Sequence, residues 1–204
     1  MKLLVATFNP GKQQEFKKIF AEIKNRCSPP IQLIFPSQLN LTDQAEEIGQ
    51  TFCQNSALKA RFFFKKSDLP TLADDGGLVI PALNGEPGVH SRRWLGRESS
   101  DEELINYALK RLKNFKTPQQ RQAFLVTCLS YFDGQRLSQT TAKIKGFIAH
   151  QPSQQRTPGY PFRDLFIVLP LNKYYNQLTD EEHHRLNHRR RALLKLWEKL
   201  GFLR

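Results

Sequence analysis

Residues 71–80, Thr-Leu-Ala-Asp-Asp-Gly-Gly-Leu-Val-Ile, are the stretch of sequence that most constrains the fold. Residues 71–73 predict a short buried strand, the Asp-Asp-Gly-Gly segment is typical of a turn, and residues 78–80 continue in an extended conformation. Two adjacent carboxylates at the end of an apolar strand are costly unless a cation meets them. Asp74 and Asp75 therefore indicate a metal ion or a basic partner. The alternative is a surface turn capped by an aspartate.

Around this stretch, helical and extended patterns follow one another without strict alternation. One helical face of residues 12–24 is apolar and carries Phe16, Ile19, Phe20 and Ile23. Ser99 or Ser100 is a plausible cap for a later helix, and Asp133-Gly134 is a hairpin signal. We expect helices at 12–24, 51–66, 101–112 and 180–200, and strands at 3–6, 31–35, 71–73, 78–80, 123–132, 137–148 and 165–169.

This mixture of elements predicts an α/β (α+β mixed) protein that forms a single domain over residues 1–204. We expect one long bent mixed β-sheet flanked by helices, with two lobes and a central cleft. The chain has 204 residues, enough for one substantial domain, and its 39% hydrophobic and 25% charged residues are typical of a globular protein.

Membrane association and disulfide bonding are not predicted. The longest apolar runs are far too short to span a bilayer, and the amino-terminal apolar run is a poor signal peptide. The three cysteines show no metal-ligand spacing. A reduced cytoplasmic protein without disulfides is the simplest interpretation.

The formal net charge of +12 has three possible meanings. A basic surface binds nucleic acid without sequence specificity, and part of the excess charge could instead line a pocket for a polyanion such as a triphosphate. The third possibility is an ordinary solvated surface. No motif indicates a specific nucleic-acid partner.

Three further segments carry groups suited to phosphate and metal chemistry. Residues 7–12, Thr-Phe-Asn-Pro-Gly-Lys, join a strand to a helix start, where free N–H groups suit phosphate; an ordinary strand–helix turn is the alternative. Glu46 and Glu47 could supply a second metal ligand or simply an acidic helix start. Arg189 offers a planar donor fork to a carbonyl or phosphate, unless it belongs to a solvated basic face.

In order and spacing, these segments resemble the inosine triphosphate pyrophosphatase family, of the bacterial RdgB dITP/XTP pyrophosphatase type. Its motif T-x-N-x-x-K-x-x-E is matched by Thr7, Asn9, Lys12 and Glu15. The A-E-E-x-G-x-T-F motif begins here at Ala45, and LPTLADDGGLVIPALNGEPGVHSRRWLG at 69–96 matches two consecutive family motifs. The closing S-H-R-x-x-A-L is matched except at its serine, which is residue 187 here.

The resemblance implies hydrolysis of a nucleoside triphosphate to the monophosphate and pyrophosphate, with Mg²⁺ as cofactor and deaminated purines (dITP, ITP, XTP) as substrates. It also implies a homodimer. The roles it implies are triphosphate binding by Thr7, Asn9 and Lys12, Mg²⁺ binding by Glu46 and Asp75, activation of the attacking water by Asp75, a close approach to substrate at Gly76, and base binding by Tyr160, Phe162, His188 and Arg189. Whether Glu46 or Glu47 is the metal ligand stays open.

The predicted base-binding segment departs from the family pattern. Arg163 stands where the family has an aspartate, His183 replaces a lysine and Asn187 replaces a serine. Asp164 could take over the missing carboxylate, although a one-residue slip along a strand reverses the direction of the side chain. Three hypotheses follow: a pyrophosphatase for deaminated purine nucleotides, a pyrophosphatase with altered nucleotide specificity, and a non-catalytic nucleotide- or nucleic-acid-binding protein that keeps the fold.

Overall fold

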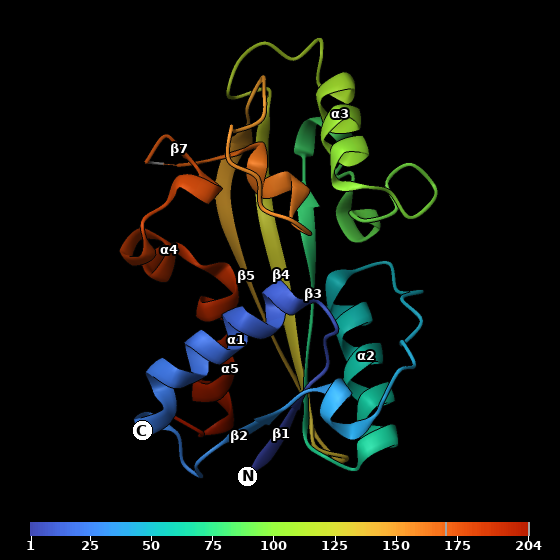
Figure 1. The fold of residues 1–204 in the computed structure, drawn as a ribbon, viewed down its shortest axis with the longest axis vertical. Helices are drawn as coiled ribbons and strands as arrows, with labels where there is room; N and C mark the ends of the chain where they lie inside the picture. The colour runs from blue at the N-terminus through green and yellow to red at the C-terminus, as the bar shows by residue number, and fades with distance from the viewer. Residues whose placement is uncertain (170, 204) are drawn as a thin grey trace. The chain divides into compact units, whose positions relative to one another are not determined.

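The structure, a computed structural model, describes residues 1–169 and 171–203, and it confirms a mixed α/β fold built on one sheet (Figure 1). The strand order is β2-β1-β3-β4-β5-β6-β7. The strands are β1 (Lys2–Val5), β2 (Gln32–Ile34), β3 (Thr71–Val79), β4 (Gln122–Phe132), β5 (Leu137–Ile148), β6 (Phe166–Val168) and β7 (Lys173–Tyr174); the helices are α1 (Pro10–Ile23), α2 (Phe52–Ser67), α3 (Asp101–Arg111), α4 (Asp180–Leu186) and α5 (His188–Leu200).

The sheet is mixed because neighbouring strands pair in parallel at one end and antiparallel at the other. β1 pairs in parallel with both β2 and β3, with Leu4 opposite Ile34 on one side and Thr71 on the other. At the other end, β6 pairs antiparallel with β5 and with β7. Parallel neighbours require crossover connections, and α1 and α2 occupy the connections that follow β1 and β2.

The chain divides into two compact units, which are described separately. The first unit contains Met1–Asp75, Thr127–Ala142 and the carboxyl-terminal segment from Arg189; the second contains Gly76–Val126 and Lys143–His188. β3, β4 and β5 contribute residues to both. The central cleft expected between two lobes stays a prediction.

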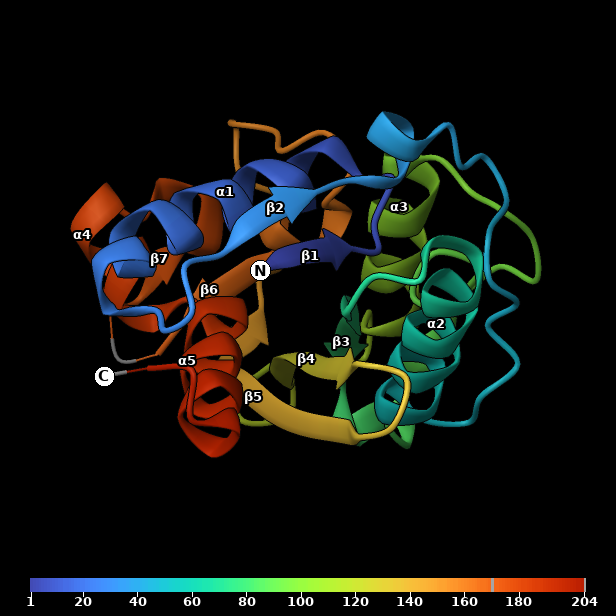
Figure 2. The same cartoon turned by 90° about the horizontal axis from the view of Figure 1, so that it is seen from below.

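The first unit has three layers, with helices on both faces of the sheet. Successive side chains of a strand point to opposite faces, so β1 contributes to the apolar packing on each side. Leu3 and Val5 of β1 pack with the apolar sides of α1 and α5. Leu4 and Ala6 instead pack against α2. Figure 1 and Figure 2 show α1 and α5 on one side of these strands and α2 on the other.

Local sequence signals account for the helix starts. α1 begins at Pro10 after Asn9, whose side chain accepts a hydrogen bond from the backbone N–H of Lys12. Its four predicted apolar residues are buried. Ser100, rather than Ser99, caps α3 in a capping box with Glu103. The Asp133-Gly134 hairpin is confirmed between β4 and β5.

Three predictions about local structure are wrong. The Asp-Asp-Gly-Gly segment is not a turn, because β3 runs unbroken from Thr71 to Val79. The expected helix at 180–200 is two helices, because Asn187 ends α4 with an extended ψ of 115°. Cys53 and Cys128 are also not separate thiols but form a disulfide that joins α2 to β4.

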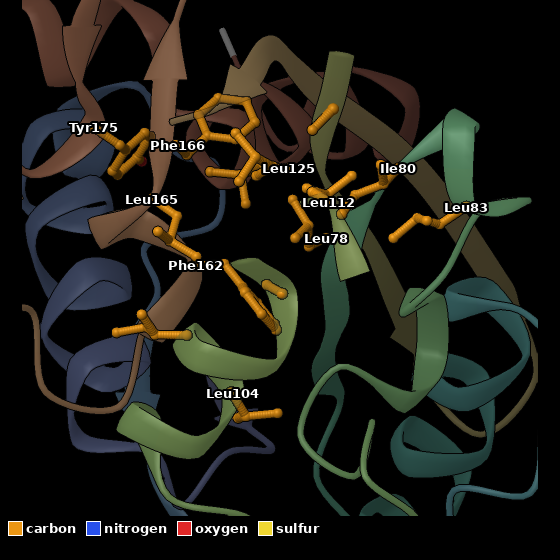
Figure 3. Packing of buried hydrophobic residues seen from close by; sticks show 14 of the residues in the cluster. Leu78, Ile80, Leu83, Leu104, Leu112, Leu125, Phe162, Leu165, Phe166 and Tyr175 are labelled. Carbon is orange, nitrogen blue, oxygen red and sulfur yellow. The ribbon is translucent and has the colours of Figure 1, made fainter. Parts of the chain in front are cut away.

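The second unit has its own apolar core, which Figure 3 shows from close by. It combines Leu78 of β3, Ile80 just after this strand, α3 residues including Leu104, and the aromatic residues Phe162 and Phe166. Gly77 must remain a glycine here, because an added Cβ would lie 2.1 Å from the hydroxyl oxygen of Ser91. No helix in the described ranges has both the length and the apolar character needed to cross a membrane.

Candidate active site

The start of α1 is one wall of the candidate site in the first unit. Asn9 caps the helix, and the hydroxyl oxygen of Thr7 accepts a hydrogen bond from the backbone N–H of Asn9 at 3.2 Å. These contacts fix the strand–helix turn that the sequence predicted. The side chain of Lys12, 18% exposed, leaves the first turn of the helix and reaches Asp74 at 2.8 Å.

Asp74 lies fully buried where β3 adjoins β1 and α1. Its Oδ1 accepts a hydrogen bond from the Thr127 hydroxyl, and its Oδ2 accepts from Lys12 at 2.8 Å and from Arg189 at 3.0 Å. Burial by itself would raise the pKa of this carboxyl, but Arg189 and Lys12 outweigh burial and hold the pKa well below its ordinary range. Asp74 is therefore a permanently ionised group with both oxygens engaged.

Asp75, the next residue, is in the opposite electrostatic situation. It is 8% exposed, and burial raises its pKa to about 6, although Lys59 and Lys12 partly offset the effect. The negative charges of Glu47 and Asp74 raise this pKa further. A carboxyl group with a pKa near 6 is mostly ionised at neutral pH and can still accept a proton, which are the properties of a general base.

The two candidate glutamates differ in position. Glu46 is exposed, whereas Glu47 is partly buried and its carboxylate lies 2.6 Å from the Lys59 ammonium. Glu47 also acts electrostatically on Asp75. The structure thus brings Glu47, the alternative that the sequence left open, to the carboxylate site.

Glu47 and Asp75 suit a hard divalent cation. Each carries oxygen donors, and the negative charge of Glu47 raises the pKa of Asp75, as expected for two carboxylates that lie near each other. The described residues contain no cluster of three or more protein ligands for a metal. A pair of carboxylates is nevertheless the usual protein contribution to a Mg²⁺ site, where substrate phosphates and water complete the coordination.

Arg189 lies in this carboxylate site. Its Nε contacts Asp74 and its Nη1 contacts Glu15 at 2.6 Å, and the side chain is only 4% exposed. The contact between Arg189 and a base carbonyl stays a prediction. His188 is buried but belongs to the second unit by its contacts, as does Gly76, which follows Asp75 in β3.

The predicted base-binding residues of the second unit form an aromatic cluster around Arg163. The guanidinium carbon of Arg163 lies 3.8 Å from the centre of the Tyr160 ring and 4.8 Å from the centre of the Tyr175 ring. The Tyr175 hydroxyl in turn lies 3.1 Å from Nε2 of His183. Arg163 thus makes cation–π contacts with both rings.

Two neighbours of this cluster have structural roles. Phe162 is buried in the core of the second unit against Trp94, with 6.0 Å between ring centres (Figure 3). Asp164 is also buried, and it accepts hydrogen bonds from the backbone N–H of Thr157 and the Asn176 amide, each at 3.0 Å. Asp164 therefore holds its own loop together, which argues against its replacing the missing carboxylate at position 163.

Sequence reasoning missed two contributors to the site. Thr127 lies in the middle of β4 and has no sequence signal, because only the strand order brings it to Asp74. Lys59 follows the matched A-E-E-x-G-x-T-F motif and had no assigned role. Its place one turn after the buried Asn55 and Ser56 on α2 is the signal that could have indicated an inward-facing cation.

Comparison with known proteins gives consistent results over nearly the whole chain. The sequence model of the Ham1 family matches residues 3–199. A dITP/XTP pyrophosphatase of Thermoanaerobacter sp. (strain X514) is 32% identical over 196 residues, 96% of this chain and 94% of the relative. A dITP/XTP pyrophosphatase of Bacillus subtilis (strain 168) is 31% identical over 197 residues, 95% of this chain and 93% of the relative.

Two solved structures have the same fold. The Staphylococcus aureus Ham1 protein has a TM-score of 0.82 at 32% identity, and a HAM1 protein from Coxiella burnetii has a TM-score of 0.83 at 28% identity. Each comparison covers 98% of both chains.

Proposed function

The chain belongs to the Ham1 family, and from this premise we propose that it hydrolyses dITP, ITP and XTP to the monophosphate and pyrophosphate. The full-length similarity to dITP/XTP pyrophosphatases supports the reaction type. The observation that carries the proposal is the opposite shift of the pKa values of two consecutive carboxyl groups, Asp74 and Asp75. One carboxylate is fixed as a charge, and its neighbour is able to take a proton.

Asp75 is the proposed general base. Attack of water on a phosphate requires a group that removes a proton from the water, and a base with a pKa near the working pH does this best. Among the carboxyl groups of the first unit, Asp75 has a pKa raised to about 6. Asp74 cannot take this role, because three donors occupy its two oxygens.

Lys12, Thr7 and Asn9 at the start of α1 are the proposed triphosphate site. The first N–H groups of a helix carry a partial positive charge, and Lys12 adds a full charge in the same turn. Lys59 supplies a second cation beside Asp75. Part of the net charge of +12 therefore has a function in binding a polyanion.

Mg²⁺ is the proposed cofactor, held by Asp75 together with Glu47 rather than Glu46. A bound Mg²⁺ would neutralise charge on the phosphates and position them. The protein's own residues supply the proton acceptor and the basic groups around it. Within the same proposal, the active form is a homodimer and the compartment is the cytoplasm, although the Cys53–Cys128 disulfide removes the argument for that compartment from reduced cysteines.

A second candidate function is the same hydrolysis with a different base preference. The observation that favours it is Arg163, which lies over Tyr160 in the segment predicted to bind the base. A guanidinium only donates hydrogen bonds, whereas the family's aspartate accepts them. Bases rich in carbonyl groups, including uracil, fit an added donor.

The test is pyrophosphate release with Mg²⁺ over a panel of dITP, XTP, dUTP, dCTP and the four common deoxynucleotides. Release from dITP and XTP supports the first function, and release from dUTP or dCTP without dITP supports the second. No release from any nucleotide would contradict both and favour the non-catalytic binding protein. The Asp75→Asn variant should lose turnover while remaining folded, and retained activity would exclude Asp75 as the base.

A further inference from the structure

α1 and α5 pack against each other on one face of the sheet in the first unit (Figure 1). The ring centres of Phe20 in α1 and Trp197 in α5 lie 5.4 Å apart. The two helices also end close together, since Cys27 pairs with Leu203 shortly after them. The solvent-exposed side chains of these helices therefore point away from the sheet and form one outer surface of this unit.

This outer surface is basic. Six of its exposed or partly exposed cationic residues are named here the α1–α5 basic surface: Lys18, Lys24, Arg26, Arg191, Lys195 and Lys199. The exposed acidic residues of the two helices are Glu22 and Glu198, and Arg190 pairs with Glu22 at 3.0 Å. Within residues 1–169 and 171–203, no ion pair involves Lys18, Lys195 or Lys199. Most of the positive charge on this surface is therefore not compensated by the protein itself.

The stability of α5 does not explain its charges. Because of the helix dipole, acidic side chains are favourable in the first turn of a helix and basic ones in the last. The first turn of α5 contains no acidic residue and carries Arg190 and Arg191 beside the buried Arg189. Positions where a sequence goes against a local rule are expected at functional sites.

The spacing of these cations fits the phosphate backbone of a nucleic acid. Arg191, Lys195 and Lys199 follow one another at intervals of four residues, so they form one stripe along α5 with about 6 Å of rise between neighbours. Each strand of duplex DNA carries one phosphate about every 3.4 Å along the axis. A stripe of this length can therefore neutralise several phosphates.

The apolar residues of the two helices argue against other polyanions. Phe16, Phe20 and Trp197 are buried, so no aromatic ring of α1 or α5 can stack on the bases of a single strand. A helix that binds an anionic membrane presents large apolar side chains beside its cations, but Leu193 and Leu196 of α5 are also buried. A surface that offers cations alone fits the backbone of a duplex best.

We propose that the α1–α5 basic surface binds duplex nucleic acid through its phosphates, without sequence specificity. This binding is a function separate from the proposed hydrolysis, because none of the six residues belongs to the candidate active site. It assigns a role to part of the net charge of +12 that a triphosphate pocket does not use.

The test is binding of a short DNA duplex of arbitrary sequence to the full chain, measured by fluorescence anisotropy over a series of salt concentrations. The variant is Lys18→Gln/Lys195→Gln/Lys199→Gln, which changes three exposed side chains. Each phosphate contact contributes about 0.9 to the slope of log K against log salt concentration, so the slope should become shallower by about 2–3. At low salt, the affinity should fall by about tenfold or more.

The matched control is Lys65→Gln/Lys66→Gln/Arg136→Gln. It removes the same three charges from exposed positions at the end of α2 and in the β4–β5 hairpin. The net charge changes equally while the α1–α5 basic surface stays intact, so the salt slope should remain close to that of the unmodified chain. Both triple variants should release pyrophosphate from dITP as the unmodified chain does, because neither changes the candidate active site.

Four results would overturn the inference. The first is no binding of the duplex by the unmodified chain at low salt. The second is an equal loss in both triple variants, which would show that binding follows the net charge and not this surface. The third is tighter binding of a single strand than of the duplex. The fourth is tighter binding of vesicles that contain anionic lipid, which would assign the surface to a membrane.

Failure of the proposed hydrolysis looks different from failure of this inference. In that case the unmodified chain would release no pyrophosphate from any nucleotide, whatever its affinity for the duplex.

Discussion

Asp74 and Asp75 are consecutive residues of β3, yet their pKa values are shifted in opposite directions. The alternation of a strand contributes to the difference, because neighbouring side chains point to opposite faces; Lys12 acts on both carboxyl groups, but their other partners differ. Asp74 meets Lys12, Arg189 and Thr127, whereas Asp75 is buried with weaker compensation from Lys59. Two identical side chains thereby acquire two chemical roles.

Replacing Asp75 with asparagine should stabilise the metal-free protein above pH 6. The pKa of Asp75 is raised from an ordinary 3.8 to about 6 in the folded state, so the folded protein binds this proton more tightly than the unfolded chain does. The resulting stabilisation is fully present below pH 3.8 and is lost as the pH rises through 6, a change of up to about 3 kcal/mol. The Asp75→Asn variant has no carboxyl group at this position, so its stability does not fall in this way as the pH rises.

The measurement is urea unfolding in the presence of a chelator at pH 7.5 and pH 4. The variant should be more stable than the unmodified chain at pH 7.5, and the difference should shrink at pH 4. Asp43→Asn, at an exposed position, is the control and should show little difference at either pH. A gain for Asp75→Asn of equal size at both pH values would contradict the assignment of the pKa.

Replacing Arg163 with aspartate should change base preference rather than catalysis in general. The variant removes the donor that lies over Tyr160 and restores the residue type of the family motif. We expect the ratio of kcat/KM for dITP to that for dUTP to rise by about tenfold or more, the size of effect that a buried polar contact has on discrimination.

The matched control for Arg163 is Lys143→Gln, which removes another cation–π partner of the second unit, 4.6 Å from the centre of the Phe124 ring. Its nucleotide preferences should equal those of the unmodified chain. A uniform loss over the whole nucleotide panel in Arg163→Asp would show that Arg163 supports the loop and does not select the base.

Reducing the Cys53–Cys128 disulfide should lower stability. The bond closes a loop with a sequence separation of 75 residues, and the entropy that a cross-link of this span removes from the unfolded chain is worth about 4.5 kcal/mol at most. Unfolding with and without dithiothreitol should differ by about 2–4 kcal/mol. In Cys53→Ser the reductant should have no effect, and an unmodified chain that is equally stable in both conditions would argue against the bond in solution.

Arg121 should be one of the most sensitive positions of the second unit. Its side chain is 2% exposed and donates to the backbone carbonyl oxygens of residues 112, 115, 148 and 149. Arg121→Met leaves these acceptors without their donor, at a cost of about 3–5 kcal/mol in the free energy of unfolding.

Chemical denaturation measures this cost directly. Arg97→Met is the matched control, because Arg97 pairs with Glu103 at the surface, and it should change the free energy of unfolding little. An equal loss in the free energy of unfolding for Arg121→Met and Arg97→Met would show that the buried hydrogen bonds of Arg121 are not specially important for stability.

The sequence by itself determined the parts of this protein that depend on near neighbours. The cap at Asn9, the apolar face of α1, the capping box at Ser100 and the hairpin at Asp133-Gly134 each involve residues within a few positions of one another. The order of the motifs also indicated the family, and it led us to predict that Lys12 and Asp75 lie in one phosphate and metal site. Those interactions follow from local backbone geometry and residue type.

Only the tertiary structure decided which distant groups meet. Asp-Asp-Gly-Gly has turn chemistry, but pairing within the sheet keeps β3 extended through it. Thr127 and Arg189 reach Asp74 across 53 and 115 residues of chain, and Cys53 reaches Cys128 across 75. The pKa values of the two aspartates depend on those contacts. Since a carboxyl group's charge state is set by burial and by the cations around it, identical adjacent residues could be told apart only after folding.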